Sequence, residues 1–118
     1  MPEGTYEKGL AGESRAADYL QMRGMVLLQR RYRSPFGEID LILRDGDTLV
    51  MAEVKARGRG REGSGLLSVG PVKRGKIIRT ARLYLAEHPW DGPVRFDVVE
   101  FTADGIRHIA DAFPGSEY

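Results

Sequence analysis

GEIDLILRDGDTLVMAEVK, residues 37–55, contains two apolar runs that are joined by a tight-turn signal. Residues 38–44 alternate polar and apolar side chains before an apolar run, and residues 48–55 are rich in Leu, Val and Met. Both patterns are typical of strands. Asp45-Gly46-Asp47 between them is typical of a two-residue hairpin loop. The stretch therefore predicts an antiparallel hairpin.

Two registers of this hairpin are compatible with the turn. If the loop is Gly46-Asp47, Asp40 faces Glu53, and if it is Asp45-Gly46, Glu38 faces Glu53. In both registers Glu38, Asp40, Glu53 and Lys55 share one face, because side chains along a strand alternate with period two. The sequence thus predicts a cluster of three acids and one lysine.

Like charges that face each other destabilise a sheet, and a divalent cation would remove that penalty. Mg²⁺ is typically held by one or two carboxylates together with waters and phosphate oxygens, and it assists phosphodiester cleavage. We therefore expect Mg²⁺, or Mn²⁺, on Asp40 and Glu53 with Glu38 as a further ligand. Lys55 would orient the attacking water or offset phosphate charge.

A competing interpretation is that these charges lie on the solvent face of half-exposed strands, which is the commoner reason for such spacing. The neighbouring residues argue against it. Leu41-Ile42-Leu43 and residues 49–52 are apolar on both faces, as in a strand covered by helices. Charges at the end of such a buried strand need partners or a metal.

The rest of the chain predicts two helices and three further strands. One helix begins at Gly4 or Thr5 and runs to about Arg23, and a second runs from Gly70-Pro71 to His88-Pro89. Strands are expected at residues 25–32, 94–101 and 106–112. A helix between the third and fourth strands permits a parallel crossover. The prediction is an α/β fold with a mixed sheet flanked by helices, in the order α-β-β-β-α-β-β, and a single domain over residues 1–118.

Charge is distributed unevenly along the chain, although the net charge is only +1. Residues 57–82 contain eight Lys or Arg and one acid, which suggests one electropositive side. The residues expected to contact nucleic-acid phosphates are Arg57, Arg59, Arg61, Lys73, Lys76 and Arg79. The alternative is an ordinary solvated face and a flexible glycine-rich connection.

Composition excludes several classes of protein. Cysteine is absent, so disulfides, zinc-thiolate sites and thiol catalysis are excluded. The first 12 residues are polar and lack the apolar core of a secretory signal, and no apolar run approaches the ~20 residues of a membrane span. We therefore expect a soluble cytoplasmic protein that does not bind membranes.

The chain resembles the PD-(D/E)XK nuclease-like proteins of restriction-endonuclease fold and, within them, the small bacterial YraN-type family. The resemblance covers about residues 7–100, and its most specific parts are GEIDLI at 37–42 and EVKAR at 53–57. Its other parts are Gly12-Glu13, Ala16-Ala17-Asp18-Tyr19-Leu20, Gly24, Arg31-Tyr32-Arg33, Lys73, Ala81, Tyr84-Leu85 and Arg95-Phe96-Asp97-Val98-Val99.

The resemblance implies a restriction-endonuclease-like, Holliday-junction-resolvase-like fold and a metal-dependent deoxyribonuclease acting on DNA. It maps Asp40 and Glu53 to metal ligands, Lys55 to the motif lysine and Glu13 to a catalytic acid on the first helix. It also implies a homodimer. Two other functions stay open at this point: a catalytically silent nucleic-acid-binding module, and a protein-interaction factor.

Two further polar residues are interpreted as structural. Asp97 lies between Phe96 and Val98 in an expected strand, where pairing with Arg95 is favoured over a ligand role. His108 has no partner pattern nearby and is expected at the surface.

Overall fold

The computed structural model describes residues 2–56, 70–102 and 104–115, and of residues 2–11 it describes the backbone alone. The chain forms two described helices and five strands in the expected order α-β-β-β-α-β-β. Their bounds are α1 Pro2–Met22, β1 Val26–Ser34, β2 Gly37–Asp45, β3 Thr48–Ala56, α3 Pro71–Glu87, β4 Val94–Thr102 and β5 Gly105–Ile109.

The five strands form one mixed sheet in the order β1-β2-β3-β4-β5. β1, β2 and β3 are antiparallel neighbours, β4 runs parallel to β3, and β5 is antiparallel to β4. The crossover through α3 thus produces the parallel pair that the sequence permits. This architecture confirms the restriction-endonuclease-like α/β fold.

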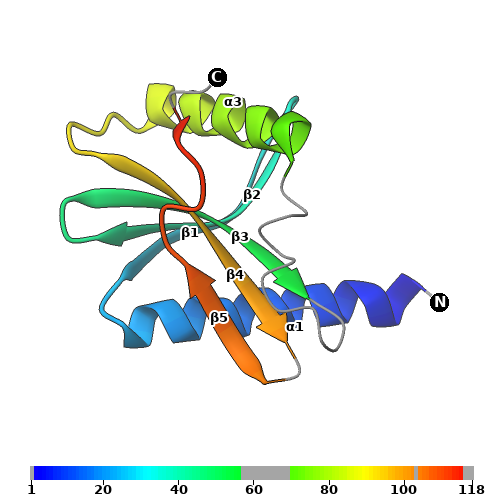
Figure 1. Cartoon of the computed structure of the whole chain (residues 1–118). Helices are drawn as coiled ribbons and strands as arrows, with labels where there is room; N and C mark the ends of the chain where they lie inside the picture. The colour runs from blue at the N-terminus through cyan, green and yellow to red at the C-terminus, as the bar shows by residue number, and fades with distance from the viewer. Residues whose placement is uncertain (1, 57–69, 103, 116–118) are drawn as a thin grey trace.

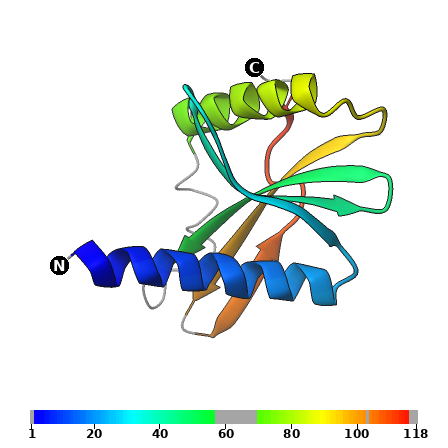
Figure 2. The same ribbon diagram turned by 180° about the vertical axis from the view of Figure 1, so that it is seen from behind.

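The two helices cover opposite faces of the sheet, as Figures 1 and 2 show. α1 packs over a buried cluster that includes Leu41, Val50 and Val99. α3 packs its Ile77, Ile78, Ala81 and Tyr84 over a second cluster on the other face. Because both faces are covered, the middle segments of β2 and β3, Leu41-Ile42-Leu43 and residues 49–52, are apolar on both faces, as their sequence indicates.

The predicted ends agree with the structure at α3 and at the end of α1, but α1 begins at Pro2, before the expected Gly4 or Thr5, and the ends of the outer strands also differ. Gly24, with φ 99°, follows α1, and Gly70 precedes Pro71 at the start of α3. β1 extends two residues beyond the expected end, to Ser34. β5 ends at Ile109 because the chain then turns, with Asp111 at φ 53°.

The β1–β2 turn lies beside the first half of α3 in both views of the ribbon (Figures 1 and 2). The Ser34 and Thr80 hydroxyl groups are 2.8 Å apart and share a hydrogen bond. The Arg79 guanidinium lies 5.6 Å from the centre of the Phe36 ring, within the range of a cation–π contact. These contacts hold the start of β2 against α3.

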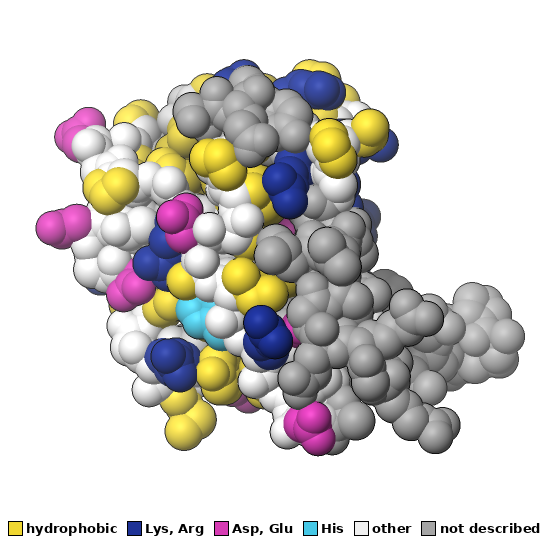
Figure 3. Space-filling view, in the orientation of Figure 1, with side chains coloured by type: hydrophobic (Ala, Val, Ile, Leu, Met, Phe, Trp, Pro, Cys, Tyr) yellow, Lys and Arg dark blue, Asp and Glu magenta, His cyan; other side chains and the backbone are white. Residues whose placement is uncertain are grey.

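No helix within the described part of the chain is long and apolar enough to cross a membrane. In Figure 3, Lys and Arg side chains lie at the top of the molecule, where α3 runs, and also at the centre and lower left, while the acidic side chains of this face lie mainly at the left.

Candidate active site

The candidate site lies where β2 and β3 separate. The last backbone pair between these strands is Leu41 with Ala52, so the loop is Gly46-Asp47 and the next two positions are Asp40 and Glu53. Beyond that pair, side chains replace the backbone ladder. The Val54 N–H donates to Asp40 Oδ2 at 2.8 Å, and the Asp40 N–H donates to Glu53 Oε2 at 3.4 Å. Each strand therefore holds the carboxylate of the other.

A cavity of about 340 Å³ opens at this point. Its lining includes every residue that the sequence assigned to catalysis and metal binding: Glu13, Glu38, Asp40, Glu53 and Lys55. Lys73 from α3 also lines it. Residues from α1, β2, β3 and α3 thus converge on one hollow at the end of the sheet.

The two central acids, Glu53 buried and Asp40 half-buried, lie in surroundings that favour their neutral forms. Glu53 is only 3% exposed. Burial and the Asp40 carboxylate raise the pKa of Glu53 to about 8, although Lys73 and Lys55 oppose the shift. Burial also raises the pKa of Asp40, against the Val54 N–H and with help from the Glu13 carboxylate. Two such acids gain most from a cation that allows both to ionise.

Two lysines complete the charged part of the cavity. Lys73 Nζ lies 3.6 Å from Glu53 Oε1. Burial and the adjacent Lys73 lower the pKa of Lys55. Burial also acts to lower the pKa of Lys73, but contacts with Lys55, Glu53 and Asp40 outweigh it and raise that pKa overall. Lys55 is therefore the lysine that gives up its proton more readily, while Lys73 stays charged.

Glu13 reaches the cavity from α1 but is already paired. The Arg31 Nε–H donates to Glu13 Oε1 at 2.8 Å, and the Glu13 side chain is almost fully buried. Arg31 lies in β1 with φ 51°, a left-handed conformation that is costly for a residue with a side chain. The contact with Glu13 thus accompanies a strained backbone position beside the site.

Glu38 lines the cavity from β2, and its Oε2 accepts a hydrogen bond from Arg33 Nε at 2.7 Å. Among residues 2–56, 70–102 and 104–115, no group of three or more His, Cys, Asp or Glu is arranged to hold a metal ion. The structure therefore brings Asp40 and Glu53 together as the central pair. A role for Glu38 as a third ligand stays a prediction.

The residues expected to contact nucleic acid fall into three positions. Lys73 belongs to the carboxylate cavity. Lys76 and Arg79 are exposed on α3. Arg57, Arg59 and Arg61 lie outside the described residues.

Two residues of the site escaped the sequence analysis in their observed roles. Lys73 was assigned to phosphate contacts because it belongs to a basic stretch, and only the fold places it against Glu53. Arg31 belongs to the Arg31-Tyr32-Arg33 part of the family resemblance, but its pairing with Glu13 joins segments 18 residues apart in the sequence. The available signal for Arg31 was its charge in a strand that leads to the acidic hairpin.

The expectation that His108 lies at the surface is wrong. Its side chain is 9% exposed, and Nε2 lies 2.7 Å from Asp97 Oδ2. The expected pairing of Asp97 with Arg95 is confirmed, with Arg95 Nε donating to Asp97 Oδ1 at 2.8 Å. A fully buried carboxylate on β4 provides the partner that the local sequence of His108 does not reveal.

The fold and this cavity define a class of protein: a small α/β protein of restriction-endonuclease-like fold with an Asp and a Glu-x-Lys segment at the split between two central strands. Comparison with known proteins narrows the class. The chain belongs to the uncharacterised protein family UPF0102, whose model matches residues 12–101, and this confirms the resemblance to the YraN-type proteins.

Individual relatives are similar over almost their whole length. A UPF0102 protein of Nitrosomonas europaea is 48% identical over 112 residues, which cover 92% of this chain and 95% of the relative. A UPF0102 protein of Thermodesulfovibrio yellowstonii is 41% identical over 107 residues, covering 91% and 96%. A UPF0102 protein of Paracidovorax citrulli is 44% identical over 113 residues, covering 92% and 84%.

Proposed function

We propose that this protein is a metal-dependent endonuclease that hydrolyses phosphodiester bonds in DNA, including branched or otherwise structured DNA. The observation that carries the proposal is the convergence of one buried acid, one half-buried acid and two lysines in one cavity, with the pKa values of both acids raised. Perturbed titratable groups that share a cavity are typical of catalytic sites. The restriction-endonuclease-like fold and the order of the motif residues support the same class.

Asp40 and Glu53 suit a divalent cation. Hard carboxylate oxygens are the ligands that Mg²⁺ and Mn²⁺ prefer, and the mutual repulsion of these two acids is what a bound cation would relieve. When bound, such a cation supplies Lewis-acid stabilisation of charge on the phosphate and lowers the pKa of a bound water.

Lys55 and Lys73 would have different roles in cleavage. The pKa of Lys55 is lowered by burial and by Lys73, so its amine can accept a proton from an attacking water or orient that water. Lys73 keeps its charge beside Glu53 and would hold a phosphate oxygen. Glu13, held by Arg31, would keep the wall of the cavity in place.

A cleavage assay tests this function directly. Purified protein is incubated with single-stranded, duplex, flap and four-way DNA in Mg²⁺ or Mn²⁺, with the Asp40→Asn protein in parallel. Cleavage by the wild type that is lost in Asp40→Asn and in EDTA is the expected result. Asn keeps an oxygen for the Val54 N–H, so the variant should stay folded.

Other outcomes would replace the proposal. Salt-dependent DNA binding without cleavage of any substrate would leave a catalytically silent nucleic-acid-binding module. Cleavage that Asp40→Asn retains would indicate a contaminating nuclease. If the wild type neither binds nor cleaves DNA at low salt, a protein-interaction factor becomes the better interpretation.

A further inference from the structure

A second cavity, of about 490 Å³, adjoins the carboxylate cavity. It lies between the start of β2 and the first two turns of α3. Glu38 and Lys73 line both cavities, so one molecule can extend from one into the other. A volume of this size accommodates a small organic ligand.

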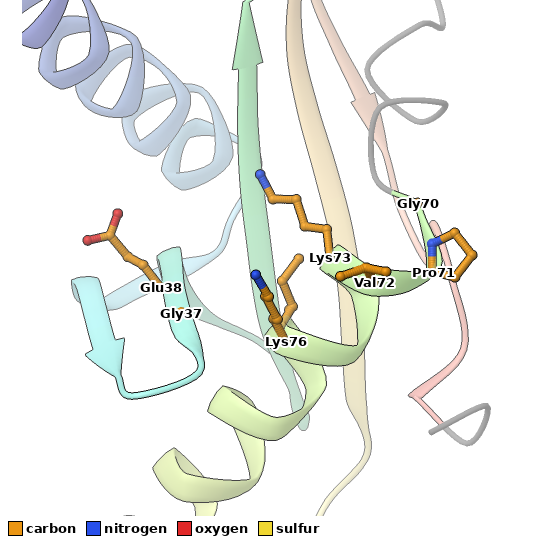
Figure 4. A pocket seen from close by; sticks show the side chains of 8 residues that line it. Gly37, Glu38, Gly70, Pro71, Val72, Lys73 and Lys76 are labelled. Carbon is orange, nitrogen blue, oxygen red and sulfur yellow. The ribbon is translucent and has the colours of Figure 1, made fainter.

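One side of this cavity is charged and the other is apolar (Figure 4). Lys73 and Lys76 project from α3 toward the side where Glu38 lies, while Pro71 and Val72 lie opposite. Arg33 pairs with Glu38, so the two lysines face an acid that is already partly neutralised. Among the described residues, the first turn of α3 carries no acidic side chain and no side-chain cap, so the helix dipole adds to the positive charge of the two lysines there.

The apolar side is built from Pro71, Val72 and Ile77. Val72 lines this cavity and is 74% exposed, so its side chain is accessible to a ligand. Gly37 forms part of the wall on β2 with φ 152°, a conformation that favours glycine. Glycine at this position leaves the wall free of a side chain.

We propose that this second cavity binds an unpaired nucleobase of the DNA whose phosphate lies at Lys73. This proposal rests on the proposed function and adds the class of substrate to it. An apolar hollow next to cationic groups at the mouth of a carboxylate site complements a nucleotide, which has an apolar flat base at one end and an anionic phosphate at the other. A cavity bounded by a strand and a helix excludes a continuous duplex, whose bases are stacked inside the double helix. Unpaired nucleotides in single strands, flaps or branch points are therefore the preferred ligands.

Binding of thymidine 5′-monophosphate tests the cavity without any cleavage. Protein signals are followed by NMR in EDTA during titration with thymidine 5′-monophosphate, deoxyribose 5-phosphate or inorganic phosphate. The expected result is that the methyl signals of Val72 and Ile77 shift with the nucleotide and not with the two phosphates that lack a base. Equal binding of all three, without shifts of these methyl groups, would overturn the proposal in favour of simple phosphate binding by the lysines.

A matched pair of valine variants assigns the effect to the cavity. Val72→Ser should weaken nucleotide binding about three- to tenfold, because it removes apolar contact with the base while leaving both lysines in place. Val26→Ser is the control, since Val26 is an exposed valine at the start of β1 that lines a different cavity. Identical affinities for the two variants would contradict the proposal.

Cleavage kinetics separate this inference from the proposed function. In Mg²⁺ we expect a higher kcat/KM on a flap than on a matched duplex, and Val72→Ser should reduce that ratio. If the wild type cleaves nothing but the nucleotide still shifts Val72 and Ile77, the nuclease proposal fails and the base-binding cavity stands. If cleavage occurs with equal kcat/KM on flap and duplex, and nucleotide binding is independent of the base, only the base-binding cavity fails.

Discussion

Two buried carboxylates, Glu53 and Asp97, occur at neighbouring positions of the sheet, and their surroundings shift their pKa values in opposite directions. Asp97 on β4 pairs with Ala52, one residue from Glu53 on β3, and its side chain points to the other face. Asp97 accepts hydrogen bonds from Arg95 and the Asp111 N–H, and it contacts His108. Although burial acts to raise the pKa of Asp97, these partners outweigh it and lower that pKa. Around Glu53, burial and the Asp40 carboxylate prevail and raise its pKa. Around Asp40, burial together with the carboxylates of Glu13 and Glu38 prevails and raises its pKa.

We interpret this difference as that between a structural acid, Asp97, and the pair proposed to act in catalysis, Asp40 and Glu53. Asp97 ties the chain after β5 to β4, because the Asp111 N–H lies 2.9 Å from Asp97 Oδ1. Such a satisfied carboxylate needs nothing from solvent or ligand. Asp40 and Glu53 line an open cavity in which both pKa values are raised, so under the proposed function a bound cation would stabilise their ionised forms.

The largest expected effect is on catalysis, at the lysine beside Asp40 and Glu53. Lys55→Ala should lower the single-turnover cleavage rate by roughly 10²–10⁴-fold with little change in DNA affinity, as is usual for a positioned acid–base group. Lys76→Ala, on the exposed face of α3, is the control and should weaken affinity without changing the rate at saturating DNA. An unchanged rate in Lys55→Ala would remove this lysine from the chemistry.

Removal of the structural acid should affect stability instead. Asp97→Ala leaves Arg95 and His108 without their buried partner, which should cost about 3–5 kcal/mol of unfolding free energy and lower Tm by roughly 10–20 °C. Asp40→Asn should keep the same Tm or raise it slightly, because it removes repulsion with Glu53. Thermal unfolding followed by circular dichroism compares the two. An equal decrease of Tm in Asp97→Ala and Asp40→Asn would contradict the distinction between the structural acid Asp97 and the pair Asp40 and Glu53.

Glu53 and Asp97 should make the stability of the metal-free protein depend on pH in opposite directions. The pKa of Glu53 rises from 4.5 to about 8, so the folded state holds a proton that the unfolded state lacks in this window, and stability falls as pH rises through it. The pKa of Asp97 is lowered from 3.8, so its stabilisation is present above that value and is lost as pH falls below it.

Calorimetry in EDTA from pH 3 to pH 9 measures this profile. Between pH 5 and pH 8.5 we expect a loss on the order of 2 kcal/mol, or about 5–10 °C in Tm. Glu53→Gln should flatten this alkaline limb, and so should saturating Mg²⁺ in the wild type. If stability falls equally steeply between pH 5 and pH 8.5 in Glu53→Gln, the proton that is released in this range belongs to another group.

The hairpin shows how far local patterns reach. Alternation, the Asp-Gly turn and the apolar runs on both sides define the strands, and the two-residue loop limits the register to two choices, of which Asp40 opposite Glu53 is the one observed. The helix between β3 and β4 permits the parallel crossover, so the order of elements and the mixed sheet also follow from local signals.

The sequence could not predict which charged groups meet across long separations. Lys73 approaches Glu53 because α3 packs across the sheet with its first turn at the end of β3, and no local pattern encodes that distance. His108 is buried because a strand 11 residues earlier carries Asp97. The hydrogen bond from the Val54 N–H to the Asp40 carboxylate forms only because the two strands stop pairing at this point. Hydrophobic alternation does not determine where that pairing ends.

The smallest expected effect concerns the exposed charges that surround the proposed catalytic pair. Lys76 and Arg79 are proposed to contact phosphates, so Lys76→Gln with Arg79→Gln should weaken DNA binding a few-fold and flatten its salt dependence by about 0.9 for each lost duplex contact. Arg23→Gln with Arg44→Gln is the matched control, since both arginines are exposed, and Arg44 lines a cavity lined by none of the proposed site residues. Fluorescence anisotropy across a series of salt concentrations gives both slopes. If the two double variants show the same slope as the wild type, the basic face of α3 is an ordinary solvated surface, and DNA recognition must then rest on the cavity lysines and on residues outside the described part of the chain.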